Sequence, residues 1–191
     1  MRGKLLESGV GIVVLVAVSV AGRLLPHAPN FTPLAATVLF AGFFFRRAGA
    51  AISVPIAAML ASDAIIGFYD WRLMAVVYGS LLAPIGLRRF LGDRASAGRV
   101  GLCSVASSVT FFLTTNFGVW MFGGFYPHTL AGIIQCYAAG LAFFQYTLAG
   151  DLFWSAFLFG GHALATSLAT SSLRKIAGTP VLVATCCPCD S

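Results

Sequence analysis

Three polar side chains stand alone inside long apolar stretches, and they are the residues best suited to bind a ligand. Asp63 lies in the segment MLASDAIIG, Asn116 in TTNFGVW and Asp151 in LAGDLFW. An ionisable group at the centre of an apolar helix costs roughly 2.5–3.5 kcal/mol on insertion scales, so it should face the protein interior and have a partner. For Asp63 the alternatives are an ion pair with Arg23 and a ligand contact. For Asn116 they are helix packing and a pocket wall, and Asp151 can instead cap the last helix.

The segment PHAPNFTP, residues 26–33, adds three polar side chains between two apolar runs. They are His27, Asn30 and Thr32. Its prolines fix the backbone and leave few N–H donors to satisfy, as a loop that folds into a membrane requires. We therefore predict that this loop forms a wall or lid of a pocket.

Aromatic residues near the predicted helix ends complete the candidate site. Trp120 is either a residue of the interfacial aromatic belt or a stacking platform for a flat ligand. The full set of candidate ligand-binding residues is His27, Asn30, Thr32, Asp63, Trp71, Asn116, Trp120, Tyr126 and Asp151.

Other chemistry finds little support in the sequence. The three histidines have no metal-ligand spacing, so we expect neither a metal nor a cofactor. No G-x-S-x-G, H-E-x-x-H or P-loop motif occurs, and no local pair of carboxylates, so we do not expect an enzyme. The CCPC motif at 186–189 lacks a second ligand pair, and we expect a short, poorly ordered tail over 176–191.

The composition points to a lipid bilayer as the surroundings of this chain. Of its 191 residues, 59% are hydrophobic and only 9% are charged, whereas soluble domains have about 25% charged residues. Too few polar groups remain to cover a water-facing surface. The net charge of +6 is then expected to belong to cytoplasmic loops, not to a nucleic-acid interface.

Apolar segments predict an all-α integral membrane protein, with a single transmembrane domain over residues 1–175. We expect six transmembrane helices, one of them short, and a short amphipathic or tilted helix over 129–147. The spans are about 9–25, 32–45, 48–67, 72–91, 100–122 and 148–173. The second, at about 21 Å, is shorter than the ~30 Å hydrocarbon core. The step from Gly150 to Asp151 is expected to end one helix and begin the next.

Basic residues predict the orientation. They fall in alternate connections, which places both termini on the cytoplasmic side of the membrane if there are six spans. Seven spans would leave Arg174 and Lys175 outside. The basic residues used are Arg2, Lys4, Arg46, Arg47, Arg88, Arg89, Arg94, Arg99, Arg174 and Lys175. The candidate ligand-binding residues then gather at the outer face.

Four stretches carry a resemblance to a known group of proteins. They are RLLPHAPNFTPLAA, AAMLASDAIIGFYDW, FFLTTNFGVWMFGGFYPHTLAG and FFQYTLAGDLFWSAFLFG. The chain resembles an uncharacterised bacterial multi-pass membrane family that is similar to the substrate-binding S components of energy-coupling factor (ECF) transporters.

The resemblance implies a fold, a function and partners. S components have six helices, bind a vitamin, a related micronutrient or a metal ion at the outer face, and work with a coupling protein and two ATPases. Their first helix contacts the coupling protein through an Ala-x-x-x-Ala motif, a spacing that Ala17 and Ala21 match here. The chain would then be the binding subunit for a vitamin-like small molecule. The alternative is a structural or assembly membrane protein, which a solid core with Asp63 paired to Arg23 would favour.

Overall fold

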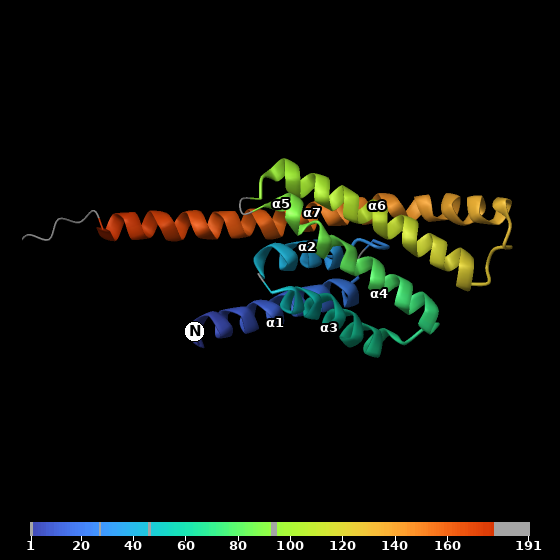
Figure 1. The fold of residues 1–191 in the computed structure, drawn as a ribbon, viewed down its shortest axis with the longest axis horizontal. Coiled ribbons are helices and arrows are strands. Elements are labelled where there is room, and N and C mark those ends of the chain that lie inside the picture. The colour runs from blue at the N-terminus through green and yellow to red at the C-terminus, as the bar shows by residue number, and fades with distance from the viewer. Residues whose placement is uncertain (1, 27, 46, 93–94, 178–191) are drawn as a thin grey trace, which may run out of the picture.

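The computed structural model describes residues 2–26, 28–45, 47–92 and 95–177, and over these residues it contains helices and no strand (Figure 1). This confirms the predicted all-α class. The helices are α1 (Arg2–Leu24), α2 (Leu34–Phe44), α3 (Ala48–Ile66), α4 (Trp71–Gly86), α5 (Arg88–Leu91), α6 (Ala97–Phe122) and α7 (Leu130–Ala177).

Four helical stretches are long and apolar enough to cross a membrane. They are Ala48–Ile66, Trp71–Leu91, Ala97–Phe122 and Leu130–Ser171, the second of which combines α4 and α5. Two further apolar stretches, Gly9–Leu24 and Leu34–Phe44, are shorter. Length and composition therefore agree with an all-α membrane protein.

Helix α2 lies at the centre of the bundle. It contacts all six other helices, and its residues 34–42 are all buried. A helix that is apolar on every side is stable only when other helices surround it or lipid does. Because its neighbours are protein, α2 can be as short as 11 residues.

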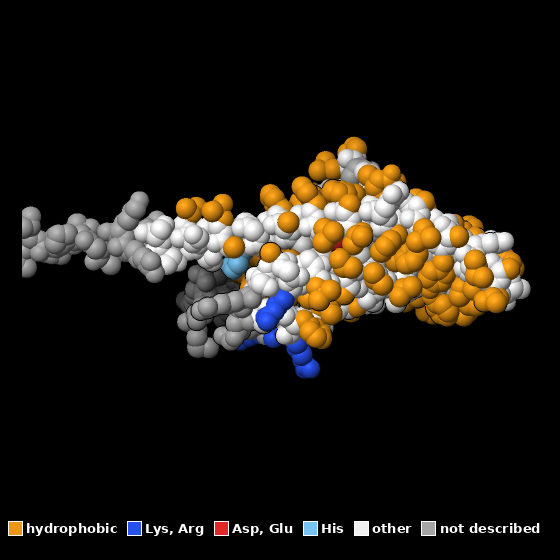
Figure 2. Space-filling model, turned by 90° about the horizontal axis from the view of Figure 1, so that it is seen from above, with side chains coloured by type: hydrophobic (Ala, Val, Ile, Leu, Met, Phe, Trp, Pro, Cys, Tyr) orange, Lys and Arg blue, Asp and Glu red, His pale blue; other side chains and the backbone are white. Residues whose placement is uncertain are grey.

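The connections between the helices fall at two ends of the bundle (Figure 1). One end, here called the loop end, holds residues 25–26, 28–33, 67–70 and 123–129. The other, here called the basic end, holds the α2–α3 and α4–α6 connections, with Arg47, Arg88, Arg89 and Arg99. Figure 2 shows Lys and Arg side chains close together, while hydrophobic side chains spread over much of the remaining surface in that view.

The predicted break before Asp151 is wrong. Helix α7 runs without interruption from Leu130 to Ala177, so there is no separate helix over 129–147 and Asp151 caps nothing. A Cβ atom on Gly150 would lie 3.1 Å from the Cα atom of Phe31 in the α1–α2 loop. The glycine is present because another backbone approaches closely. Inside a helix it costs only about 1 kcal/mol relative to alanine.

Some sequence predictions lie outside the described residues. His27, Arg46 and Arg94 belong to this group, as does the tail from residue 178 with its CCPC motif. The domain limit at residue 175 stays a prediction.

Candidate functional site

A cavity of about 230 Å³, here called the polar cavity, lies where the six longer helices meet. Each of these helices contributes to its wall, and so does the α1–α2 loop. The lining residues are Arg23, Asn30, Thr32, Leu34, Ala35, Met59, Val77, Leu81, Phe111, Thr147 and Asp151. A mostly apolar wall with a few convergent polar groups is the usual composition of a small-molecule site.

The α1–α2 loop reaches the cavity because it folds against α7. The backbone N–H of Phe31 donates to the carbonyl of Ala28 at 3.0 Å, which closes a turn. Within this turn Asn30 has φ of 60°, a left-handed conformation that asparagine tolerates better than most residues. The Phe31 ring packs against Phe153 at 5.7 Å between centroids, next to Gly150.

The end of the same loop is fixed against α1. Pro33 is fully buried, and a Cβ atom on Gly22 would lie 2.3 Å from the Cδ atom of Pro33. The two contacts, with α7 and with α1, hold Asn30 and Thr32 in the cavity wall. The loop therefore forms a wall of the cavity.

Asp151 is the buried carboxyl group of this cavity. Its side chain is 3% exposed, and Ser108 on α6 donates a hydrogen bond to its Oδ2 atom at 2.6 Å. No other hydrogen bond or ion pair to Asp151 is seen among the described residues. The Ser108 hydroxyl also lies 3.0 Å from the carbonyl oxygen of Ser104. Since a hydroxyl has one hydrogen, Ser108 donates it fully to only one of these acceptors.

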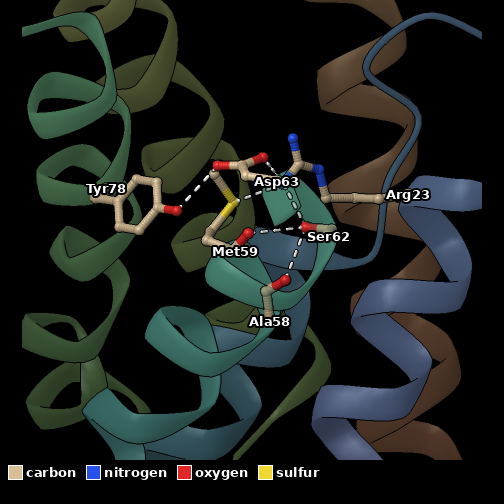
Figure 3. Close-up of polar contacts among 6 residues, drawn as sticks. All are labelled: Arg23, Ala58, Met59, Ser62, Asp63 and Tyr78. Atoms are coloured by element: carbon tan, nitrogen blue, oxygen red, sulfur yellow. Dashed lines mark hydrogen bonds and ion pairs between the residues drawn. The ribbon is translucent and has the colours of Figure 1, made fainter. Parts of the chain in front are cut away.

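Asp63 on α3 links α1 to α4 through Arg23 and Tyr78. These three residues, here called the tether, are drawn in Figure 3. Arg23 approaches its carboxylate from one side and Tyr78 from the other, with Nη1–Oδ1 and Oη–Oδ2 distances of 2.7 and 2.9 Å. The same Nη1 atom donates to the Ser62 hydroxyl at 2.5 Å and lies 3.2 Å from the Met59 sulfur. Asp63 is 1% exposed and both of its oxygens are satisfied. Arg23 and Met59, not Asp63, line the cavity.

The tether lies close to the α3–α4 loop. Burial raises the pKa of Tyr69 in that loop, and the negative charge of Asp63 raises it further, while the positive charge of Arg23 opposes both. The phenol of Tyr69, which is neutral at pH 7 in any case, therefore also resists ionisation at more alkaline pH.

A second cavity of about 260 Å³, here called the aromatic cavity, adjoins the first. Both are lined by Asn30, Val77, Phe111 and Thr147. The other lining residues are Phe112, Thr115, Asn116, Val119, Gly140, Phe143 and Phe144.

Asn116 combines the two roles that its sequence context left open. Its Nδ2 atom donates to the carbonyl of Phe112 in the same helix at 2.8 Å. Its Oδ1 atom lies so near Gly140 on α7 that a Cβ atom there would be 2.3 Å away. Asn116 therefore helps α6 and α7 to approach and is also part of the wall of the aromatic cavity.

The tryptophan candidates lie elsewhere on the loop end. Trp71 is 71% exposed, and the guanidinium of Arg72 lies 5.6 Å from its ring centroid. Trp120 donates from Nε1 to the carbonyl of Pro127 at 3.1 Å, and its ring packs against His128. It therefore fixes the α6–α7 loop, and neither tryptophan lines either cavity.

Of the remaining candidates, Tyr126 is half-buried in the α6–α7 loop and also lines neither cavity. The structure thus brings together Asn30, Thr32, Asn116 and Asp151. Asp63 does not line the polar cavity but forms an ion pair with Arg23, which does. No group of three or more His, Cys, Asp or Glu side chains that could hold a metal ion occurs in the described part of the chain.

Four residues that line the polar cavity or bind Asp63 or Asp151 were absent from the candidate set. Thr147 had a usable signal, because it precedes Asp151 by four positions and so shares its helix face. Arg23 was considered only as the partner of Asp63, although it lines the cavity as well. Ser108 and Tyr78 have no distinguishing context, since only the packing of α6 on α7 and of α3 on α4 brings them to the carboxylates.

Helix α1 leaves one face without a protein neighbour. Among the described residues it contacts only α2 and α3. Ala17 and Ala21 are both exposed on the uncovered side, together with Val10, Val13 and Val14. This face is open to lipid or to another protein.

Fold and cavities together define an all-α protein of the multi-pass membrane class, with cavities where its helices meet. Residues 5–174 match the DUF6580 family, described as a family of unknown function, and the chain belongs to that family. No curated protein and no solved structure matches the chain.

Proposed function

We propose that the protein is a membrane-embedded binding subunit that takes up a small molecule, similar in role to the S components of ECF transporters. The observation that carries this proposal is the polar cavity, into which all six longer helices and the α1–α2 loop project side chains. A cavity at the meeting point of helices is a common position for ligand sites in helical bundles.

Three further features support the same role. The helices alternate in direction between the basic end and the loop end (Figure 1), so a basic end in the cytoplasm leaves the polar cavity near the outer face of a bacterial inner membrane. The sequence shows no P-loop, which fits a binding subunit that takes its energy from separate ATPases. The exposed Ala17 and Ala21 would serve as contacts for the coupling protein.

A purely structural role has one observation in its favour. Asp63 is fully satisfied by Arg23 and Tyr78, as a residue that only holds helices together would be. Such a protein has no need, however, for a buried carboxyl group with a single hydrogen bond beside a cavity, as found at Asp151. Buried polar groups of that kind are costly and mark functional sites in membrane helices.

Native mass spectrometry of the purified protein tests the proposal by looking for a retained small molecule. Thr147 is 8% exposed and lines both cavities, so Thr147→Phe fills the space between them. Ala139 is exposed on the same helix, so Ala139→Phe is the matched control. We expect retention by the wild type and by Ala139→Phe, and loss in Thr147→Phe. Equal retention in all three proteins would show that the molecule binds elsewhere.

A further inference from the structure

We infer that the ligand is an organic cation with a flat or aromatic body. Its positive group would be held by Asp151 in the polar cavity, and its body would lie among the phenylalanines of the aromatic cavity. This inference rests on the proposed function, and it adds the chemical class of the molecule that the site accepts.

The first argument is the balance of charge in the polar cavity. Among the described residues, Arg23 and Asp151 are the charged residues in its wall. Arg23 is already neutralised, because its Nη1 atom lies 2.7 Å from the Asp63 carboxylate. Asp151 has no ion-pair partner in the described part of the chain. The cavity and its tether therefore have one uncompensated negative charge when Asp151 is ionised.

The second argument is the cost of that charge. A buried carboxylate is stable only when it is paired and hydrogen-bonded. Asp151 is 3% exposed and receives one hydrogen bond, from Ser108 at 2.6 Å. A ligand with an ammonium or similar positive group would supply the missing partner, whereas an anion would add a second negative charge. A neutral ligand would supply no positive partner for the ionised form of Asp151.

The third argument is the composition of the adjoining space. Phe111, Phe112, Phe143 and Phe144 all line the aromatic cavity. Ring faces attract both flat apolar groups and cations, and the attraction to cations is strongest where water is excluded. Because Asn30, Val77, Phe111 and Thr147 line both cavities, one molecule can place its charge in the first and its ring in the second.

Three small probes of similar shape but different charge show which ligand charge the site accepts. Phenethylammonium is a cation, phenethyl alcohol is neutral and 3-phenylpropanoate is an anion. Their binding to the full-length protein in detergent at neutral pH is measured by equilibrium dialysis. We expect phenethylammonium to bind the wild type at least 10-fold more tightly than either of the other probes.

The variants Asp151→Asn, Thr147→Phe and Asp70→Asn complete the experiment. Asp70 is exposed and caps α4, so Asp70→Asn controls for the loss of a carboxylate elsewhere. We expect phenethylammonium binding to fall at least 10-fold in Asp151→Asn, to be lost in Thr147→Phe and to be unchanged in Asp70→Asn. The comparison of three probes on the wild type needs no variant, so it decides the question even if Asp151→Asn does not fold.

The outcomes distinguish this inference from the proposed function. Equal or tighter binding of the neutral or anionic probe, lost in Thr147→Phe, would overturn the cationic class and leave the binding function standing. Unchanged cation binding in a folded Asp151→Asn protein would do the same. If no probe binds the wild type, or if Thr147→Phe changes nothing, both the inference and the assigned site are overturned.

Discussion

Removal of Arg23 should destabilise the protein more than removal of the charge on Asp63. The substitutions are Arg23→Gln, which leaves a shorter uncharged polar side chain, and Asp63→Asn, which keeps the size of the side chain and removes its charge. The asymmetry follows from burial, because the Asp63 side chain is 1% exposed and that of Arg23 is 18% exposed. Arg23→Gln leaves a fully buried carboxylate with Tyr78 as its remaining donor. Asp63→Asn leaves a guanidinium that still reaches solvent and still contacts Ser62.

The magnitudes follow from the number and type of bonds lost. Leaving a buried charge without its partner costs about 3–5 kcal/mol, so Arg23→Gln should lower the free energy of unfolding by about 3 kcal/mol or more. Asp63→Asn loses one charge-assisted hydrogen bond, worth about 1.5–3 kcal/mol. The double variant has no buried charge left, so its loss should be smaller than the sum by about 2 kcal/mol.

The assay is equilibrium unfolding in mixed detergent micelles with increasing SDS, followed by circular dichroism, for the wild type and the three variants. Arg72→Gln is the control, because Arg72 is exposed and its guanidinium lies near the rings of Trp71 and Phe122, with no ion pair to it among the described residues. It should change the free energy of unfolding by less than about 0.5 kcal/mol. Additive effects of Arg23→Gln and Asp63→Asn, or a larger loss for Asp63→Asn, would refute this account of the tether.

Two further predictions concern α6 and its neighbours. Gly140→Ala should destabilise by about 1–2 kcal/mol in the same unfolding assay, because its Cβ atom would lie 2.3 Å from Oδ1 of Asn116. Gly161→Ala on the same helix meets nothing within 4 Å and should be neutral or stabilise by up to about 1 kcal/mol, so equal losses would contradict the predicted contact. Trp120→Phe removes the 3.1 Å hydrogen bond to Pro127, and hydrogen exchange over residues 123–129 should speed up while cavity residues keep their protection. Unchanged exchange there would mean that the bond does not fix the loop.

The lengths of the apolar segments in the sequence were enough to predict most of the fold. They located the helices because a membrane span must satisfy its own backbone groups over a fixed thickness. They also singled out residues 32–45 as too short to cross unaided, and the structure shows the reason, since α2 is enclosed by the other helices. The depth that Arg23 and Asp63 share in the first and third spans was enough to name their ion pair as an alternative.

The errors arose where one residue type has two physical uses. A glycine before an aspartate is typical of a helix boundary, but Gly150 instead makes room for Phe31. An aromatic residue near a helix end can also fix a loop, and Trp120 donates a hydrogen bond to the carbonyl of Pro127 in the α6–α7 loop. The sequence could not identify Ser108 and Tyr78, because their hydrogen bonds to Asp151 and Asp63 depend on which helices pack together. That pairing is set by packing between distant segments.

The short central helix also has a consequence for the way the chain enters a membrane. An 11-residue helix is about 16 Å long, too short to be recognised and retained in a bilayer by its own hydrophobicity. It would therefore be inserted with α1 as a hairpin. Its neighbours α6 and α7 are the last helices to be synthesised. Phe40 of α2 packs against Phe159 and His162 of α7, so one side of α2 lacks this protein cover until translation has passed His162. The second helix of the chain is thus among the last to be fully packed against protein. Until α6 and α7 are made, the nascent protein depends most on lipid or on an insertion factor to cover α2.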